Sequence, residues 1–390
     1  MQVTYLMRCL AMMRGGGETQ HLAWMRALRR LGVDIDIITG QPLLGAPVYS
    51  PEPDLPTTTL RSPYMRDVVY RLQSRRGFGR LTMWALHGDE ELFCRLAFNR
   101  IAARRQPPDL VLAHALHQAP RLAPRDYPIA VYLPGPPHAR YIADLQGADG
   151  LISDGWAAKQ LPAMIGRPVY DVLKGVDVDT FTPDGATLRA AQGLDGAKVI
   201  ICVTRLVPIK NLPMMLEAVA LLRQSRSDVV LVLVGEGPQQ PALEERARAL
   251  GIGEAVRFAG YVPQNETAAW YRTADVFALS SDFDNSPNVV LEAMAAGLPI
   301  VATDVGGLRE YVTEPRNGRL TPKGDAHAFA AALASYLNDE ECAQTTGALN
   351  RADAVSRFSW AASAARMREV YAEIIDRFRT RTGSPRVKAS

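Results

Sequence analysis

The sequence predicts an α/β protein built from two doubly wound domains, each with a parallel sheet covered by helices on both faces. Short, β-branched apolar runs alternate with stretches of helical periodicity from one end of the chain to the other. These runs are apolar at nearly every position, which is typical of strands buried on both faces. The length of 390 residues also fits two domains of about 100–200 residues each.

The first domain is expected to contain a series of buried strands, with a helix between the first two. On that helix Leu22, Met25 and Leu28 recur every three residues and share one face. The expected strands are 3–10, 33–39, 109–113, 129–133 and 150–153.

The second domain repeats the alternation more cleanly. Its expected strands are 199–204, 229–235, 256–259, 276–280 and 300–303, with helices at 214–222, 241–250 and 287–296. A polar, turn-rich stretch at 177–196 predicts the join. The expected domains are therefore 1–180 and 181–365. A last helix at 360–378 follows, and residues 366–390 are expected to return to the first domain and end in a basic tail.

Composition excludes several classes of protein. Forty-four Lys and Arg against 41 Asp and Glu leave a net charge of +3, too small for a dedicated nucleic-acid binder. The four cysteines stand singly and fit no zinc or disulfide spacing, so we expect buried thiols of a reducing compartment. No apolar run of about 18 residues and no signal-peptide pattern is present, which predicts a soluble, cytoplasmic protein.

One segment is strongly basic. Between Arg61 and Arg105 there are ten arginines, interleaved with aromatic and apolar residues. One interpretation is a pair of surface helices whose arginines are solvated. The other is a basic, aromatic face that contacts an anionic acceptor or the inner face of a membrane, which would make the protein peripheral there.

The first candidate binding motif is a glycine triplet. Gly15–Gly17 follows the first expected strand and opens the first helix, with Glu18 next. Without side chains, these residues let a phosphate approach the backbone N–H groups and the positive helix end. A plain tight turn is the alternative interpretation.

A second motif follows the first strand of the second domain. Arg205 and Lys210 leave that strand five residues apart, around Pro208. Two cations at the carboxyl end of a central strand can offset the charge of a diphosphate and stabilise it as a leaving group. The alternative is a pair of unrelated surface charges.

A third motif lies between 278 and 304. Ser286 is expected to cap a helix that has Pro287 at its first position. Asp284 precedes this helix, and Glu292 lies eight residues later. Two carboxylates at this spacing can serve one elongated ligand. A capping acid and an unrelated helical Glu form the alternative.

Together these motifs resemble GT-B glycosyltransferases of family 4, which are retaining and use nucleotide-sugar donors. The resemblance covers nearly the whole chain and is densest from 199 to 307. It implies that Arg205 and Lys210 bind the donor diphosphate, with the Gly16 and Gly17 backbone nearby. It also implies that Val262 lies at the nucleobase and that Glu292 binds the ribose. The donor sugar would be bound by Asp284, Asn285 and Ser286. Further matches are 234–238, Lys174–Asp177 with Phe181, and Phe358–Trp360.

The family also has a histidine at the mouth of a first-domain strand. His114 ends the strand expected at 109–113 and is the best match, with His117 as the fallback. The implied catalytic role is to position the donor sugar and polarise the reacting centre, together with Asp284. A packing or surface imidazole is the alternative.

The chain departs from the family pattern at several positions. Asp284 is one methylene shorter than the usual Glu, Asn285 replaces a Gly, and Lys174 stands where relatives often have Asn.

The resemblance as a whole implies a hexosyltransferase, with UDP favoured over GDP in the donor and a cell-envelope, lipid-linked or other saccharide as acceptor. A catalytically idle binding subunit, or an epimerase or phosphorylase on the same fold, is the alternative.

The sequence Asp282-Phe283-Asp284 spells the D-x-D that binds a metal in the other major glycosyltransferase fold. Here Arg205, Lys210 and the helix end can neutralise a diphosphate instead. We therefore expect no metal and no cofactor beyond the donor.

Overall fold

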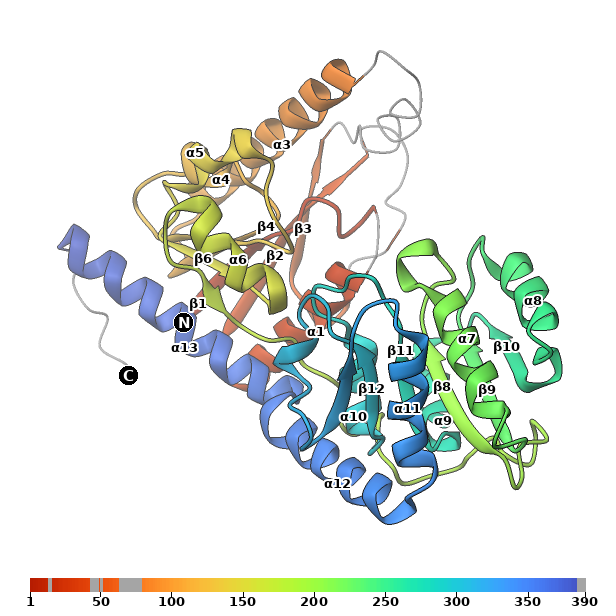
Figure 1. Ribbon diagram of the computed structural model, residues 1–390. Helices are drawn as coiled ribbons and strands as arrows, with labels where there is room; N and C mark the ends of the chain where they lie inside the picture. The colour runs from red at the N-terminus through yellow and green to blue at the C-terminus, as the bar shows by residue number, and fades with distance from the viewer. Residues whose placement is uncertain (13–15, 43–48, 50–51, 63–78, 384–390) are drawn as a thin grey trace. The chain divides into compact units, whose positions relative to one another are not determined.

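The computed structural model describes residues 1–12, 16–42, 49, 52–62 and 79–383. Its contacts divide the chain into a first unit, Met1–Leu173 with Ser363–Ser390, and a second unit, Lys174–Ala362. Figure 1 shows that helices flank the sheet of each unit.

The first unit holds a parallel sheet of seven strands in the order β3-β2-β1-β4-β5-β6-β7. The strands are β1 (Gln2–Leu6), β2 (Asp34–Gln41), β3 (Thr57–Arg61), β4 (Leu110–His114), β5 (Ile129–Tyr132), β6 (Gly150–Ser153) and β7 (Tyr170–Asp171). The helices are α1 (Gly16–Arg30), α3 (Gly79–Ala102), α4 (Ala119–Leu122), α5 (Ile142–Leu145), α6 (Gly155–Ile165) and most of α13 (Trp360–Thr382). A buried cluster under α3 includes Phe93, Val111 and Val131.

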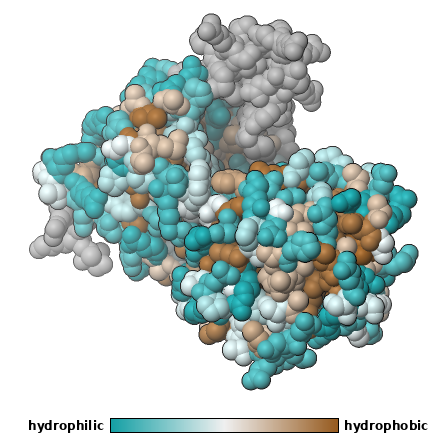
Figure 2. Space-filling view, viewed as in Figure 1, coloured by the Kyte–Doolittle hydropathy of each residue, from teal (hydrophilic) through white to brown (hydrophobic). Residues whose placement is uncertain are grey.

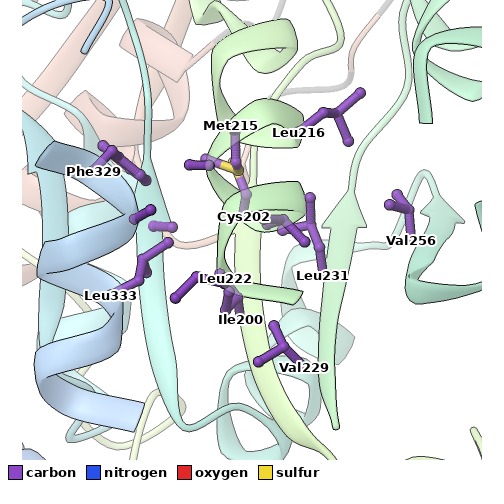
Figure 3. Close-up of a cluster of buried hydrophobic side chains, with 14 of the residues drawn as sticks. Ile200, Cys202, Met215, Leu216, Leu222, Val229, Leu231, Val256, Phe329 and Leu333 are labelled. Atoms are coloured by element: carbon purple, nitrogen blue, oxygen red, sulfur yellow. The ribbon is translucent and has the colours of Figure 1, made fainter. Parts of the chain in front are cut away.

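The second unit holds a parallel sheet of six strands in the order β10-β9-β8-β11-β12-β13. The strands are β8 (Lys198–Val203), β9 (Val229–Val234), β10 (Val256–Gly260), β11 (Val276–Leu279), β12 (Ile300–Thr303) and β13 (Gly318–Thr321). The helices are α7 (Leu212–Arg223), α8 (Gln240–Ala249), α9 (Gln264–Thr273), α10 (Asn288–Ala295), α11 (Ala326–Leu337) and α12 (Glu340–Arg357). Figure 3 shows its core, where Ile200 and Leu231 meet Met215 of α7 and Phe329 of α11.

Both sheets reverse their strand order in the middle. The chain runs outward from β1 and returns to its other side at β4, and it repeats this at β8 and β11. Ligands of doubly wound sheets bind beyond the carboxyl ends of the strands at such a switch point. The fold therefore points to the residues that follow β1 and β4 in one unit, and β8 and β11 in the other.

The final helix, α13, packs against the sheet of the first unit. The Tyr5 and Tyr371 hydroxyls are 2.7 Å apart, and Trp24 Nε1 donates to Ser363 Oγ at 2.6 Å. At the far end, Arg379 pairs with Asp109 at 2.8 Å. These contacts explain why the chain after Ser363 groups with the first unit.

The unit boundaries differ from the expected 180/181 and 365/366. They fall at 173/174 and 362/363. The reason is that residues after Lys174 already bond to the second unit: Val176 N donates to the Phe358 carbonyl at 2.8 Å, and Arg351 Nη1 donates to the Val178 carbonyl at 2.8 Å.

The expectation for the cysteines needs a correction. Cys94 and Cys202 are buried, but Cys9 and Cys342 are partly exposed, so the expectation of buried thiols is wrong for two of the four.

Much of the Arg61–Arg105 segment lies outside the described residues. Within the described part, no helix combines the length and the apolar character needed to cross a membrane.

Candidate functional site

Two loops meet beyond the carboxyl ends of β8 and β11. The turn after β8 includes a short 3₁₀ helix, η2 (Pro208–Lys210). Ser280 Oγ, at the end of β11, donates to the Lys210 carbonyl at 2.8 Å, and Asp282 N donates to the Ile209 carbonyl at 2.8 Å. The two loops thus form one hydrogen-bonded unit at the switch point of the second sheet.

This arrangement brings Lys210 and Asp284 together. Lys210 Nζ lies 2.7 Å from Asp284 Oδ1 and 3.0 Å from Oδ2, and both side chains are largely buried. The Asp284 backbone is fixed as well, because its carbonyl accepts a bond from Gly307 N at 2.9 Å. A Cβ on Gly306, which has φ +55°, would overlap that carbonyl oxygen, so only glycine fits there. The structure thus holds a cation and an acid in fixed positions at the sheet edge.

The D-x-D sequence has partners for both of its carboxylates. Asp282 Oδ1 accepts a hydrogen bond from Asn211 Nδ2 at 3.0 Å and lies 3.6 Å from Lys323 Nζ. Asp284 is occupied by Lys210. Among the described residues, no group of three or more His, Cys, Asp or Glu side chains is placed to hold a metal. The two aspartates therefore act as clamps on the turn after β8.

Arg205 lies on the same turn and is exposed. Within the described ranges it has no carboxylate partner. The backbone beside it is packed against the loop after β9, where Leu206 N donates to the Glu236 carbonyl at 2.9 Å. A Cβ on Gly235 or Gly237 would overlap carbonyl oxygens of this turn, which explains both glycines of the segment 234–238. Arg205 is thus an exposed cation on a rigid base.

Glu292 lies on α10 and is 8% exposed. It accepts a bond from the Tyr271 hydroxyl on Oε2 at 2.8 Å and from Gln264 Nε2 on Oε1 at 3.2 Å. Burial raises the pKa of Glu292, and these two hydrogen bonds oppose that rise by stabilising the carboxylate. Neither partner was identified from the sequence.

The prediction that Ser286 caps α10 is wrong. The helix starts at Asn288 with Pro287 at the capping position and no side-chain cap. Ser286 Oγ instead makes a short hydrogen bond with the Tyr311 hydroxyl. Lys174 also reaches this loop, since its Nζ donates to the Ser286 carbonyl at 3.2 Å. The Lys174 departure from the family pattern therefore places an ammonium beside the predicted sugar-binding residues, with the partly exposed Asn285 between Asp284 and Ser286.

The loop after β10 also lies beyond the carboxyl end of its strand, on the same side of the parallel sheet. Val262 is partly exposed two residues beyond β10, and the Gly260 carbonyl accepts a bond from Gly235 N at 2.8 Å. Large hydrophobic side chains are exposed on all three loops: Ile209 at 45%, Tyr261 at 70% and Phe283 at 38%. On the face seen in Figure 2, hydrophobic residues of the second unit gather in patches bordered by hydrophilic ones. Exposed apolar side chains beside fixed charges are typical of a ligand site.

In the first unit, His114 is the last residue of β4. Its Nε2 is buried and has no hydrogen-bond partner among the described residues. A Cβ on Gly17 would lie 3.8 Å from this nitrogen, so α1 begins directly beside the imidazole. Gly16 is the first residue of α1, and Gly15 lies outside the described residues. The sequence-predicted residues Gly17 and His114 are therefore brought together.

Aromatic rings surround His114. It stacks on Tyr132 with ring centroids 5.7 Å apart, and the edge of His21 meets it at 4.3 Å. Burial lowers the pKa of His114 to about 4, Glu18 opposes this shift and His117 adds to it. The fallback, His117, stacks on Tyr141 at 4.8 Å instead. His21 was missed because its position on the apolar face of α1 gave no signal beyond that of a core residue.

The geometry of the second unit agrees with a comparison of sequences. Residues 185–352 match the family described as "Glycosyl transferases group 1". Over this range the chain is similar to that family. The matched range contains Arg205, Lys210, Asp284 and Glu292.

Curated relatives of the chain are also glycosyltransferases. A GDP-mannose-dependent alpha-(1-6)-phosphatidylinositol monomannoside mannosyltransferase of Mycolicibacterium smegmatis is 34% identical over 50% of this chain and 54% of its own length. A D-inositol 3-phosphate glycosyltransferase of Streptomyces scabiei is 34% identical over 67% of this chain and 62% of its own. The chain thus spans about half to three-fifths of the length of these relatives.

Solved structures share the fold. Anabaena HepE in complex with UDP has a TM-score of 0.71 and 18% identity, over 96% of this chain and 100% of that chain. Sucrose-phosphate synthase from Thermosynechococcus elongatus has a TM-score of 0.73 and 20% identity, over 96% and 99% of the two chains. These likenesses confirm the predicted GT-B architecture of two Rossmann-like, parallel-sheet domains.

Proposed function

We propose that this protein is a retaining hexosyltransferase that moves a hexose from a nucleoside diphosphate sugar to a hydroxyl acceptor. The observation that carries the proposal is the set of groups at the switch point of the second sheet. There, Arg205 and Lys210 supply positive charge, and Asp284 and Glu292 supply acceptors at fixed positions. The curated relatives that carry glycosyltransferase names support the same reaction class.

In the proposed reaction, the bond between the anomeric carbon and the diphosphate oxygen breaks, and the acceptor oxygen bonds to the same face of that carbon. The acceptor's proton goes to the departing phosphate. Arg205, Lys210 and the N–H groups at the start of α10 stabilise the negative charge that develops on the diphosphate. When the diphosphate arrives, Lys210 exchanges part of its pairing with Asp284 for the phosphate, which frees Asp284 to accept from a sugar hydroxyl.

The first unit contributes His114 and the start of α1. Because burial lowers the pKa of His114 to about 4, the imidazole is neutral near pH 7. We propose that it positions the sugar by hydrogen bonding and does not carry a positive charge. The unpartnered Nε2 supports this role, since a buried polar atom without a partner costs free energy that a ligand can recover.

We further propose that the transfer needs no metal ion. The support is that Asp282 and Asp284 already bond to Asn211 and Lys210, which leaves these carboxylates engaged in the protein's own contacts. Activity measured after dialysis against EDTA should equal that of untreated enzyme. Loss of turnover with EDTA and its rescue by manganese would contradict the proposal.

The base and the acceptor need a direct test. The sequence resemblance favours UDP, whereas the M. smegmatis relative is named for GDP-mannose. The names of these relatives also suggest phosphatidylinositol mannoside and inositol phosphate as acceptors to test beside saccharides. Thermal shifts against UDP, GDP, ADP and their sugars should reveal one preferred base, because a ligand that binds only the folded state raises Tm.

The preferred donor is then incubated with the acceptor panel, and the anomeric configuration of the product is read by NMR. Retention supports the proposal. A protein that binds the donor but neither hydrolyses nor transfers it would instead be an idle binding subunit, a rival favoured by the Asp284 and Asn285 departures. Inversion, or turnover that requires inorganic phosphate, would also contradict the proposed reaction.

A further inference from the structure

Glu292 is held by two side chains of a neighbouring helix. Helix α9 packs against α10 and supplies Tyr271 and Gln264. Each donates to a different carboxylate oxygen, Tyr271 at 2.8 Å and Gln264 at 3.2 Å. The carboxylate therefore cannot turn about its terminal bond without losing both hydrogen bonds.

The count of acceptor positions shows what this leaves for a ligand. An ionised carboxylate has two oxygens and about four lone-pair sites. Tyr271 and Gln264 take one site on each oxygen, so one further site remains on each. Two adjacent acceptor sites match two hydroxyl donors on neighbouring carbons, as in the cis-diol of a ribose. A 2′-deoxyribose offers only one of the two.

Tyr271 is fixed by its own surroundings. It is fully buried, and its ring meets the edge of Phe181 at a centroid distance of 5.7 Å and lies 6.1 Å from Phe277. Such packing leaves the hydroxyl little freedom to follow a displaced carboxylate. Gln264, in contrast, is exposed and lies two residues after Val262, the predicted nucleobase position. The two donors thus connect Glu292 to the core on one side and to the loop after β10 on the other.

We propose that Tyr271 and Gln264 are positioning residues that orient Glu292 toward both ribose hydroxyls, so that the second unit selects ribonucleotides over 2′-deoxyribonucleotides. This inference rests on the proposed function, which assigns Glu292 to the donor ribose. It goes further because it attributes the choice between ribose and 2′-deoxyribose to two residues that do not contact the reacting atoms.

The test compares binding of UDP with 2′-deoxy-UDP, and of GDP with 2′-deoxy-GDP, by titration calorimetry on the full chain. Wild-type protein should prefer the ribonucleotide by about tenfold or more, the value of one good hydrogen bond. In Tyr271→Phe and Gln264→Leu this preference should fall below about threefold, because Glu292 is then free to turn. With an active donor, its KM should rise in both variants while kcat changes little.

Tyr127→Phe is the matched control. Tyr127 is also a buried tyrosine, but its hydroxyl has no hydrogen-bond partner among the described residues of the first unit. This variant should keep the wild-type preference. Because Gln264 is exposed, Gln264→Leu decides the question if Tyr271→Phe fails to fold.

Three outcomes would overturn the inference. Wild-type protein that binds ribo- and deoxyribonucleotides equally, or variants that keep the full preference, would refute it and leave the proposed function intact. Wild-type protein that binds neither UDP nor GDP would refute the inference and the proposed donor site together.

Discussion

The candidate residues of the two units are held in place by different forces. In the second unit, Lys210, Asp284 and Glu292 each form hydrogen bonds to a neighbouring side chain. In the first unit, His114 lies among the rings of His21 and Tyr132, and its buried Nε2 has no partner among the described residues. One site is organised by polar bonds and the other by packing.

This difference fits the two tasks proposed for them. A diphosphate brings charge, so its site needs cations and acceptors already aligned before it binds. Positioning a sugar beside the reacting carbon calls for a neutral group in a low-dielectric setting, which burial of His114 provides. Substitution of charged groups should therefore lower activity most in the second unit. In the first unit, the burial of His114 should appear as a dependence of stability on pH.

The largest effect on activity is expected for the variant Lys210→Ala. Loss of this cation should lower kcat/KM by about 30- to 1,000-fold, or about 2–4 kcal/mol of transition-state stabilisation. Lys198→Ala is the matched control, because Lys198 starts the same strand at its opposite end and pairs with Glu340 at 3.7 Å. Steady-state kinetics of both variants check this. Equal activities in the two would remove Lys210 from the donor site.

The next largest effect is on Gly306→Ala. Its Cβ would overlap the Asp284 carbonyl at φ +55°, so we expect a loss of about 2–3 kcal/mol in the free energy of unfolding and weaker nucleotide binding. Gly324→Ala separates the causes, because Gly324 has φ +77° but an added Cβ meets nothing within 4 Å. That control should lose about 1 kcal/mol and keep nucleotide affinity. Urea unfolding and calorimetry measure both quantities, and equal losses of stability would contradict the overlap.

A smaller effect is expected from His114→Phe, which keeps a ring in the cluster. The pKa of His114 is about 4 in the folded protein and near 6.5 when unfolded, so its contribution to stability is present above pH 6.5. That contribution is lost as pH falls toward 4, with a slope of at most about 1.4 kcal/mol per pH unit. The free energy of unfolding, measured at pH 7, 6 and 5, should fall less steeply with decreasing pH for His114→Phe than for wild type. Tyr127→Phe, which also changes a buried ring of the first unit, should leave the slope unchanged.

The smallest effect is expected for Glu292→Gln, and its dependence on pH has the opposite sign to that of His114→Phe. Because burial raises the pKa of Glu292, ionisation of this group costs stability as pH rises through the raised value. Relative to wild type, Glu292→Gln should therefore be more stable at pH 8 than at pH 5, although it binds nucleotide more weakly. Parallel unfolding curves at the two pH values check this, and a difference that shrinks with rising pH would contradict it.

Much of the fold could be predicted because most strands are continuous apolar runs. The sequence locates β6 and β12 at their observed bounds and most others within two residues. It misses β3, β7 and β13, which read TTTLR, YD and GRLT, because these short or polar strands lack an apolar run. The first strand ends at Leu6 and not at 10, because the chain turns there: Leu10 N donates to the Met7 carbonyl at 3.2 Å.

The candidate site was predictable where a motif has a fixed spacing. Arg205, Lys210, Asp284 and Glu292 follow strands in order, so parallel topology brings them to one edge. Their partners were not predictable, because Tyr271 and Gln264 stand on a separate helix with no spacing rule to Glu292. The cap predicted at Ser286 failed for a related reason, since Tyr311 competes for its hydroxyl.

The central claim is that Arg205 and Lys210 bind the diphosphate of the donor. It is tested most directly by the affinity ratio of UDP to UMP, and of GDP to GMP, in wild-type protein and in the double variant Arg205→Ala/Lys210→Ala. The account predicts that wild type prefers the diphosphate by at least about tenfold and that the double variant binds both forms alike. A preference of equal size in the two proteins would contradict it.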